Sequence, residues 1–176
     1  MERQEIAVNE LLVNPFELWS TNWALLTSGD FASRHFNSMT VAWGRLGIML
    51  NKPFAMVVVR PQRYTRQFID ESDSFTLSVF PEAYRQILET LGTKSGREMD
   101  KINASGLTPT ASTKVASPSF LEAELLVECR KMYFADFEPK HFLSDFIKDL
   151  YKNDYHRMYF GEVLAIAGTA RYKLAP

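Results

Sequence analysis

Short apolar runs recur along most of this chain, and their length and alternation predict strands more often than helices. Residues 1–13 are too polar to continue this pattern and predict a loosely attached lead-in. Glycines 44 and 47 interrupt one run and indicate a bulge or a close backbone approach. The predicted strands are 22–30, 39–50, 54–60, 74–80, 120–137, which is long enough to be bent or bulged, and 156–172.

Helices are expected to be few and short. Asn14-Pro15 has the residue types of a helix start, and Gly92 has the residue type that ends one. The predicted helices begin at 14–15 and cover 64–72, 81–91, about 99–104, and 139–153 from Pro139. We therefore predict one domain over residues 1–176, mainly β with short helices (α+β). The strand spacing favours a closed barrel over a doubly wound parallel sheet, and the glycine-rich turn of dinucleotide-binding folds is absent.

Composition narrows the class of protein. Hydrophobic residues make up 46% of the chain, which is enough for a full core, and the net charge is −1. This charge balance disfavours nucleic acid or an anionic membrane as a partner. The single cysteine, Cys129, excludes a disulfide framework, and no apolar segment resembles a signal peptide or a membrane span. We expect a cytoplasmic protein.

The segment VVVRPQRYT, residues 57–65, begins as a buried strand and ends with two cations and two hydroxyls. Arg60 and Arg63 supply forked donors, and Tyr64 and Thr65 stand at the start of the following helix. Such groups suit a phosphate. A solvated turn with a surface salt bridge is an equally good interpretation of this segment alone.

Two other polar segments have a similar character. GTKSGRE, residues 92–98, combines glycines, hydroxyls and cations, which lets backbone amides and Lys94 face an anion, although an ordinary flexible loop is the better interpretation of this segment alone. It lacks the spacing of a nucleoside-triphosphate loop.

NSMTVAWG, residues 37–44, offers short polar side chains (Asn37, Ser38, Thr40) beside Met39 and Trp43, a mixture that suits a flat heteroaromatic ring. A strand with one polar face is the alternative.

Other reactive residue types form no known catalytic pattern. The histidines 35, 141 and 156 lack metal-ligand spacing, and no serine-hydrolase motif is present. Cys129 lies in a predicted strand and is expected to be a small buried residue. With no acid–base or covalent machinery in view, a cofactor is the expected source of the chemistry.

Together these segments resemble the flavin reductase-like family, which has the FMN-binding split β-barrel, and most closely its flavoredoxin-type branch. The resemblance extends from about residue 22 to 166. One departure is Leu50, where such proteins often have tryptophan before Asn-Lys-Pro. The sequence segments that carry the resemblance are NSMTVAWG, NKPFAMVVVRPQRYT, FTLSVF, GTKSGREMDKINASGLTP, EAELLVECRKMYFADF and YFGEVLAI.

The resemblance implies a split barrel that binds FMN at a homodimer interface. It implies that the FMN phosphate meets Arg60, Tyr64 and Thr65, with Lys94, Ser95 and Gly96 closing over it. The implied neighbours of the ring and ribityl chain are Asn37, Ser38, Met39, Thr40, Trp43 and Gly44, with Ser78 and Phe80 nearby.

Two functions are compatible with this family. The first is an oxidoreductase in which FMN takes a hydride from NADH or NADPH and passes electrons to a flavin or another acceptor. The second is an FMN-binding electron carrier that does not itself turn over nicotinamide. Fold alone does not choose between them.

Overall fold

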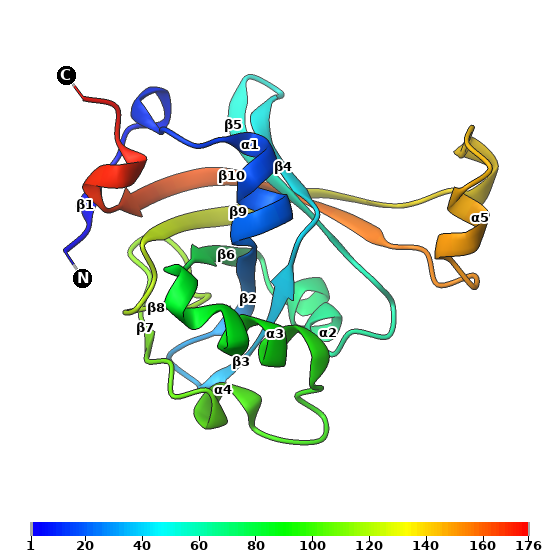
Figure 1. The fold of residues 1–176 in the computed structure, drawn as a ribbon, viewed down its shortest axis with the longest axis horizontal. Helices are drawn as coiled ribbons and strands as arrows, with labels where there is room; N and C mark the ends of the chain where they lie inside the picture. The colour runs from blue at the N-terminus through cyan, green and yellow to red at the C-terminus, as the bar shows by residue number, and fades with distance from the viewer. Residues whose placement is uncertain (1, 176) are drawn as a thin grey trace.

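Most strands of the molecule form one antiparallel sheet, shown in Figure 1, and two short strands form a separate pair. The computed structural model describes residues 2–175. Within these residues the strand order is β3-β2-β6-β9-β10-β5-β4, with β1 added beside β10. The bounds are β2 Ala24–Asp30, β3 His35–Val41, β4 Gly44–Met49, β5 Lys52–Val59, β6 Ser74–Val79, β9 Leu125–Asp136 and β10 Arg157–Gly168.

The sheet curls into a split barrel that stays open. Its two ends are β3 and β4, and no ladder joins them in the described part of the chain. The prediction of a closed barrel was therefore wrong, and so was that of a single strand over 39–50. Ala42 and Trp43 separate two strands there, because β3 pairs with β2 whereas β4 pairs with β5. Gly44 does make the expected close approach, since an added Cβ would collide with the Trp19 ring.

The β4–β5 hairpin closes through a tight turn. Leu50 and Asn51 both have positive φ, 53° and 59°. Two consecutive residues of this kind are typical of a type I′ turn, which matches the twist of a hairpin. Asn51 tolerates this conformation well, whereas Leu50, which is 76% exposed, is an unusual residue for it.

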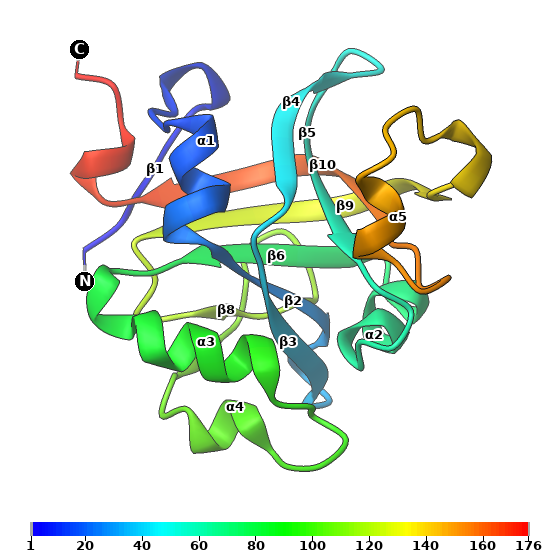
Figure 2. The same ribbon diagram turned by 45° about the vertical axis from the view of Figure 1, so that its right-hand side comes forward.

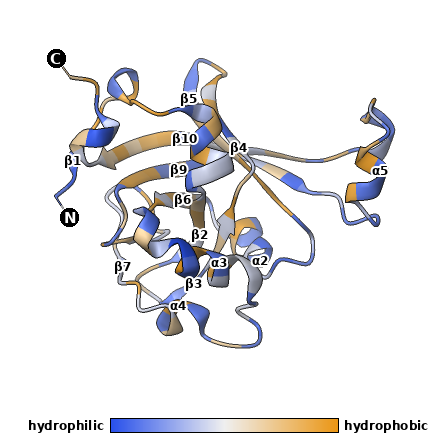
Figure 3. Cartoon of the chain, viewed as in Figure 1, coloured by the Kyte–Doolittle hydropathy of each residue, from blue (hydrophilic) through white to orange (hydrophobic). Residues whose placement is uncertain are grey.

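Two apolar cores lie on the two faces of the sheet. Phe75, Leu77 and Val127 belong to the cluster inside the curl, and Leu25, Phe80 and Leu126 to the second cluster on the opposite face. The second cluster is covered by α3 (Arg85–Thr93) and the short strand pair β7 (Pro109–Thr110) and β8 (Ser119–Phe120). Figure 2 shows α3 lying across this face, and Figure 3 shows the apolar character of the central strands.

The N-terminal segment is attached to the sheet, contrary to the expectation of a loose lead-in. The strand β1 (Gln4–Glu5) pairs with β10, and Ile6 is buried in the inner core. The Arg3 guanidinium donates to the carbonyl oxygens of Phe120, Leu121 and Ala123 at 2.6–3.2 Å. These backbone and side-chain bonds fix residues 3–6; residue 1 lies outside the described residues.

The predicted helix start at Asn14-Pro15 is confirmed. The Asn14 side chain accepts from the backbone N–H groups of Phe16 and Glu17, which caps α1 (Pro15–Glu17). A π-helical turn, Leu18–Asn22, continues it. The other helices are α2 Thr65–Glu71, α4 Lys101–Ala104, α5 Ile147–Leu150 and the 3-10 turns Val8–Glu10, Glu82–Tyr84, Pro139–His141 and Ala170–Tyr172. No helix in the described range is long and apolar enough to cross a bilayer.

Residues 137–156 form an arm that projects from the body, as Figure 1 shows. A helix over 139–153 was predicted, but only two short turns form there. The rings of Phe142, Tyr151 and Tyr155 stack on one another instead, with centroids 4.8–6.1 Å apart. Packing among rings has replaced helix formation. Leu143, by contrast, is 98% exposed.

The two strands that lead into the arm are long and bulged. The β9–β10 ladder shifts register between Phe160 and Gly161 and again between Val163 and Ala165. At Gly161 an added Cβ would come within 2.6 Å of the Phe75 ring and 2.7 Å of Cys129. Glycine there lets β10 cross closely over the inner core. The register shifts confirm the expectation that the strand over 120–137 is bent or bulged.

Candidate functional site

Two of the three predicted polar segments meet through a buried hydrogen bond. Asn37 lies on β3 and Thr65 begins α2, and the Asn37 Nδ2 donates to Thr65 Oγ1 at 2.8 Å. The two residues are 4% and 1% exposed. A buried amide–hydroxyl bond of this kind fixes the start of α2 against the sheet.

The third segment joins them at Gly96. An added Cβ at this residue would lie 2.7 Å from Asn37 Oδ1 and 2.9 Å from Tyr64 Cδ1, so only glycine allows the loop this close. The next residue, Arg97, places its guanidinium 4.7 Å above the Tyr64 ring and donates to the Gln62 carbonyl at 3.1 Å. We call Asn37, Tyr64, Thr65, Gly96 and Arg97 the loop cluster.

A hollow of about 680 Å³ opens beside the loop cluster. Rings form much of its wall, and Asn37, Tyr64 and Gly96 belong to both hollow and cluster. The further aromatic residues of the wall are Phe31, His35, Phe36 and Phe68. A cavity with aromatic walls and a few polar groups suits a flat, partly polar ligand.

Two cations, the buried Lys101 and the half-buried Arg63, hold the end of α3, where the 92–98 loop begins. The Lys101 Nζ donates to the carbonyls of Leu91 at 2.8 Å and Lys94 at 3.1 Å. Arg63 donates to the Gly92 carbonyl at 2.5 Å. Burial, and secondarily the nearby Arg63 charge, lowers the pKa of Lys101 to about 8; burial also lowers the pKa of Arg63. Nothing in the sequence signalled that Lys101 is buried.

A second cluster forms where the arm meets the body. Arg60 donates to Asp154 at 2.7 Å and to the Leu150 carbonyl at 3.2 Å, and its guanidinium lies 5.2 Å from the Tyr151 ring centre. The Tyr151 hydroxyl is 2.8 Å from Nδ1 of His156. We call Trp43, Arg60, Tyr151, Asp154 and His156 the arm cluster. Trp43 joins it because its ring lies 5.0 Å from that of His156.

The pKa values of the arm cluster follow from its contacts. A backbone N–H bond from Lys152, followed by the Gln62 side chain and the Arg60 charge, lowers the pKa of Asp154 to about 2. Burial first, and then the Arg60 charge, lowers the pKa of His156 to about 4. At neutral pH Asp154 is therefore ionised and His156 is neutral. Sequence reasoning considered His156 only as a metal ligand and missed this placement.

Four further predicted residues lie on or beside β3. Met39 faces the inner core. Ser38 is fully buried on the other face, where its hydroxyl is 2.7 Å from that of Thr27. Thr40 donates to the Leu88 carbonyl of α3, and Gly44 packs on Trp19. The structure thus sets the side chains of Ser38 and Met39 into the body, away from the loop cluster.

The remaining predicted residues divide between core and surface. Ser78 is fully buried, and its hydroxyl has no hydrogen-bond partner among the described residues. Phe80 packs between Tyr84 and Phe120 in the second core. Lys94 is exposed, while the Ser95 hydroxyl accepts from the Arg97 backbone N–H. Ser95 and Lys94 therefore lie at the loop cluster, whereas Ser78 and Phe80 do not.

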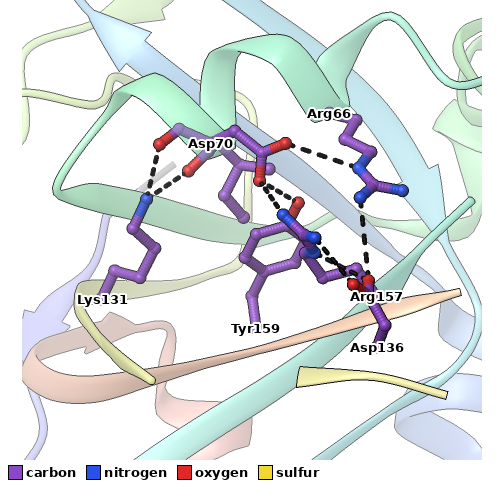
Figure 4. Close-up of polar contacts among 7 residues, drawn as sticks. Arg66, Asp70, Lys131, Asp136, Arg157 and Tyr159 are labelled. Carbon is purple, nitrogen blue, oxygen red and sulfur yellow. Dashed lines mark hydrogen bonds and ion pairs between the residues drawn. The ribbon is translucent and has the colours of Figure 1, made fainter. Parts of the chain in front are cut away.

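The far end of α2 is anchored to β9 and β10 by the network in Figure 4. Asp70 accepts from the Tyr159 hydroxyl at 2.5 Å and from Arg157 at 3.3 Å. The Lys131 Nζ donates to the carbonyls of Ile69 and Asp70 at 2.6 and 3.0 Å. Bonds to Asp136 and Asp70 raise the pKa of Arg157, which stays charged. These contacts fix the direction in which α2 presents Thr65.

Comparison with known proteins agrees with this architecture. Residues 17–171 match the family model described as "Flavin reductase like domain". A segment of 108 residues is 30% identical to the uncharacterized protein YddH of Escherichia coli (strain K12), covering 60% of this chain and 56% of that protein. The chain thus spans little more than half the length of this curated relative.

Solved structures show the same fold at low identity. The flavoredoxin of Desulfovibrio vulgaris (Miyazaki F) superposes with a TM-score of 0.66 at 24% identity, over 87% of this chain and 72% of that one. The flavoredoxin of Methanosarcina acetivorans gives 0.67 at 20%, over 96% and 74%. The NADH:FAD oxidoreductase SgcE6 of Streptomyces globisporus gives 0.64 at 15%, over 87% and 78%.

Proposed function

The chain belongs to the flavin reductase-like family, and we propose that it binds FMN as an oxidoreductase, passing reducing equivalents from NADH or NADPH to a flavin or another electron acceptor. A cytoplasmic setting is part of this proposal. The observation that carries it is the loop cluster, in which the first half of β3, the start of α2 and the 92–98 loop meet beside an aromatic-walled hollow.

The residues present fit FMN. Tyr64, Thr65 and Ser95 provide hydroxyls and Lys94 a cation, the donors that a phosphate requires. Gly96 lets the loop backbone come close to these donors, because any larger residue would collide with Asn37 and Tyr64. β3 is paired with β2 along one edge only in the described sheet, so its other edge leaves backbone groups available to the polar rim of a ring.

We assign the phosphate to Tyr64, Thr65, Lys94 and Ser95, with Arg60 able to join once it leaves Asp154. The flat ring would be held between β3 and the arm cluster, where Trp43 is 47% exposed. When bound, FMN would supply hydride acceptance from the nicotinamide and electron release to the acceptor. The protein's part is orientation, because His156 is neutral at pH 7 and the loop cluster contains no carboxylate.

We also propose that the protein is a homodimer with FMN near the interface. Supporting this, the arm and its root carry large exposed apolar side chains, including Leu143 at 98%, Phe146 at 64% and Tyr133 at 53%. Packing against a second copy would remove these apolar side chains from water. Light scattering should give twice the chain mass; a monomer that binds FMN fully would contradict the proposal.

An anaerobic titration tests the oxidoreductase. Protein loaded with FMN should lose its yellow absorbance on addition of NADH or NADPH and regain it on addition of free flavin. Bleaching by dithionite but by neither nicotinamide would favour the electron carrier instead, a function suggested by the flavoredoxin name of two structural neighbours. Failure to bind FMN at all would overturn both.

A further inference from the structure

The end of α3 holds a concentration of positive charge that the proposed chemistry does not yet use. Lys101 is 3% exposed, and Arg63 lies close enough to lower its pKa. Together they donate to the carbonyls of Leu91, Gly92 and Lys94. These contacts tie both cations to the last turn of α3 and to the first residues of the 92–98 loop.

No carboxylate within 4.0 Å pairs with either cation in the described structure. The charged side chains nearest to Lys101 along the chain are all exposed, and they are Lys94, Arg97, Glu98 and Asp100. Helix-end carbonyls carry only partial negative charge, so they compensate the buried Lys101 and the half-buried Arg63 incompletely. Burying a cation without a counter-charge is costly, and this site therefore favours a bound anion.

Lys101 also lines the hollow beside the loop cluster, together with Gly96 and Tyr64. Its hydrogen bond to the Lys94 carbonyl sets the course of the chain two residues before Gly96 passes Asn37. The same side chain thus fixes the loop and brings positive charge to the place where the loop meets the start of α2.

We propose that Lys101, with Arg63, positions the 92–98 loop for the FMN phosphate, and that this phosphate neutralises the buried Lys101 and the half-buried Arg63. The proposal rests on the proposed FMN site and assigns a positioning role to a residue outside it. Lys101 acts through the loop carbonyls and through its charge, and it takes no part in electron transfer.

The charge of Lys101 makes FMN binding depend on pH in one direction. In the ligand-free protein its pKa is about 8, and a nearby phosphate dianion favours the protonated form. The complex therefore holds more protons than the free protein at pH above 8, and FMN affinity falls as the pH rises past that value. Riboflavin has no phosphate, so its affinity should not follow this profile.

The test compares FMN and riboflavin affinities, measured by flavin fluorescence between pH 6.5 and 9.5, in the full chain and three variants. Lys101→Met removes the charge, Lys101→Arg retains it throughout this range, and Lys114→Met removes an exposed cation elsewhere as the matched control. We expect Lys101→Met to weaken FMN binding about 10-fold at pH 7 while changing riboflavin binding less than about threefold. Lys101→Arg should keep FMN affinity without the alkaline decline, and Lys114→Met should behave as the wild type.

An equal loss of both flavins in Lys101→Met would show a purely structural lysine and overturn the inference. A constant ratio of FMN to riboflavin affinity in the wild type across pH 8–9.5 would also overturn it, even if Lys101→Met does not fold. Wild-type protein that binds FMN no better than riboflavin would instead reject the phosphate site itself. That result separates failure of the proposed function from failure of the role of Lys101.

Discussion

The loop cluster and the arm cluster each place an arginine over a tyrosine ring, but they are held in different ways. Asn37 and Thr65 are almost fully buried and are fixed by the sheet, α2 and the end of α3. The side chains of Arg60 and Asp154 remain 33% and 26% exposed, and Asp154 belongs to the projecting arm. The first cluster is thus a preformed part of the body, whereas the second exists only while the arm keeps its position.

The largest effect is expected from filling the space at Gly96. Gly96→Val should weaken FMN binding about 10- to 100-fold, because its side chain displaces the loop from Asn37 and Tyr64 at a cost of roughly 1–3 kcal/mol. Titration of flavin fluorescence measures the change. Gly106, which has φ +72° and open space around it, provides the control Gly106→Asn, expected to bind normally. Normal binding by Gly96→Val would show that the loop does not close on the ligand.

Acid should weaken the arm cluster through His156. Its pKa is about 4 in the folded protein and ordinarily about 6.5, so the unfolded chain binds more protons between these values. The free energy of unfolding should therefore fall on the order of 2 kcal/mol as pH drops from 6.5 to 4. Urea unfolding of His156→Phe should show less of this loss, while exposed His141→Phe should retain it. Equal losses in both variants would contradict the assignment.

Removing the buried bond of the loop cluster should have a smaller effect. Asn37→Ala deprives the Thr65 hydroxyl of its donor and should lower the free energy of unfolding by about 1–2 kcal/mol. Thr65→Ser keeps the hydroxyl and should cost less than Thr65→Val. Thermal unfolding measures all three. If Thr65→Val is as stable as Thr65→Ser, the bond contributes nothing to the body.

The smallest change should come from freeing Arg60. Asp154→Asn removes the carboxylate that competes with a phosphate for this guanidinium, and exposed ion pairs are weak. FMN affinity should rise roughly two- to fivefold, which corresponds to less than about 1 kcal/mol. In an Arg60→Ala background the same substitution should have no effect. An increase that persists without Arg60 would mean that Asp154 acts on the ligand directly.

Much of the sheet could be predicted because apolar residues recur at regular spacing along its strands. The strands over 74–80, 120–137 and 156–172 follow from such patterns, and the length of 120–137 also indicated a bend or bulge. The break at Ala42-Trp43 could not, since it depends on β3 and β4 choosing different neighbours. The arm was predicted to be helical because its ring stacking is a tertiary contact that local periodicity does not show.

The site was predictable at the level of segments more than of side chains. Composition alone indicated three polar segments, and the structure brings Asn37, Thr65 and Gly96 together. Which face of β3 each residue occupies depends on register, so Ser38 and Met39 turned out to be inside the body. The partner of Arg60 comes from a residue 94 positions away, a distance at which sequence gives no signal.

The network around Asp70 couples the position of α2 to that of the arm. Its first residue, Thr65, lies in the loop cluster, and its last turn is bonded to Lys131 on β9 and to Arg157 and Tyr159 on β10. The arm grows from those same two strands, since Arg157 directly follows His156. A displacement of the arm would therefore tilt the whole helix and move Thr65. That movement would strain the 2.8 Å hydrogen bond between the Thr65 hydroxyl and the Asn37 amide, which holds the other side of the cluster.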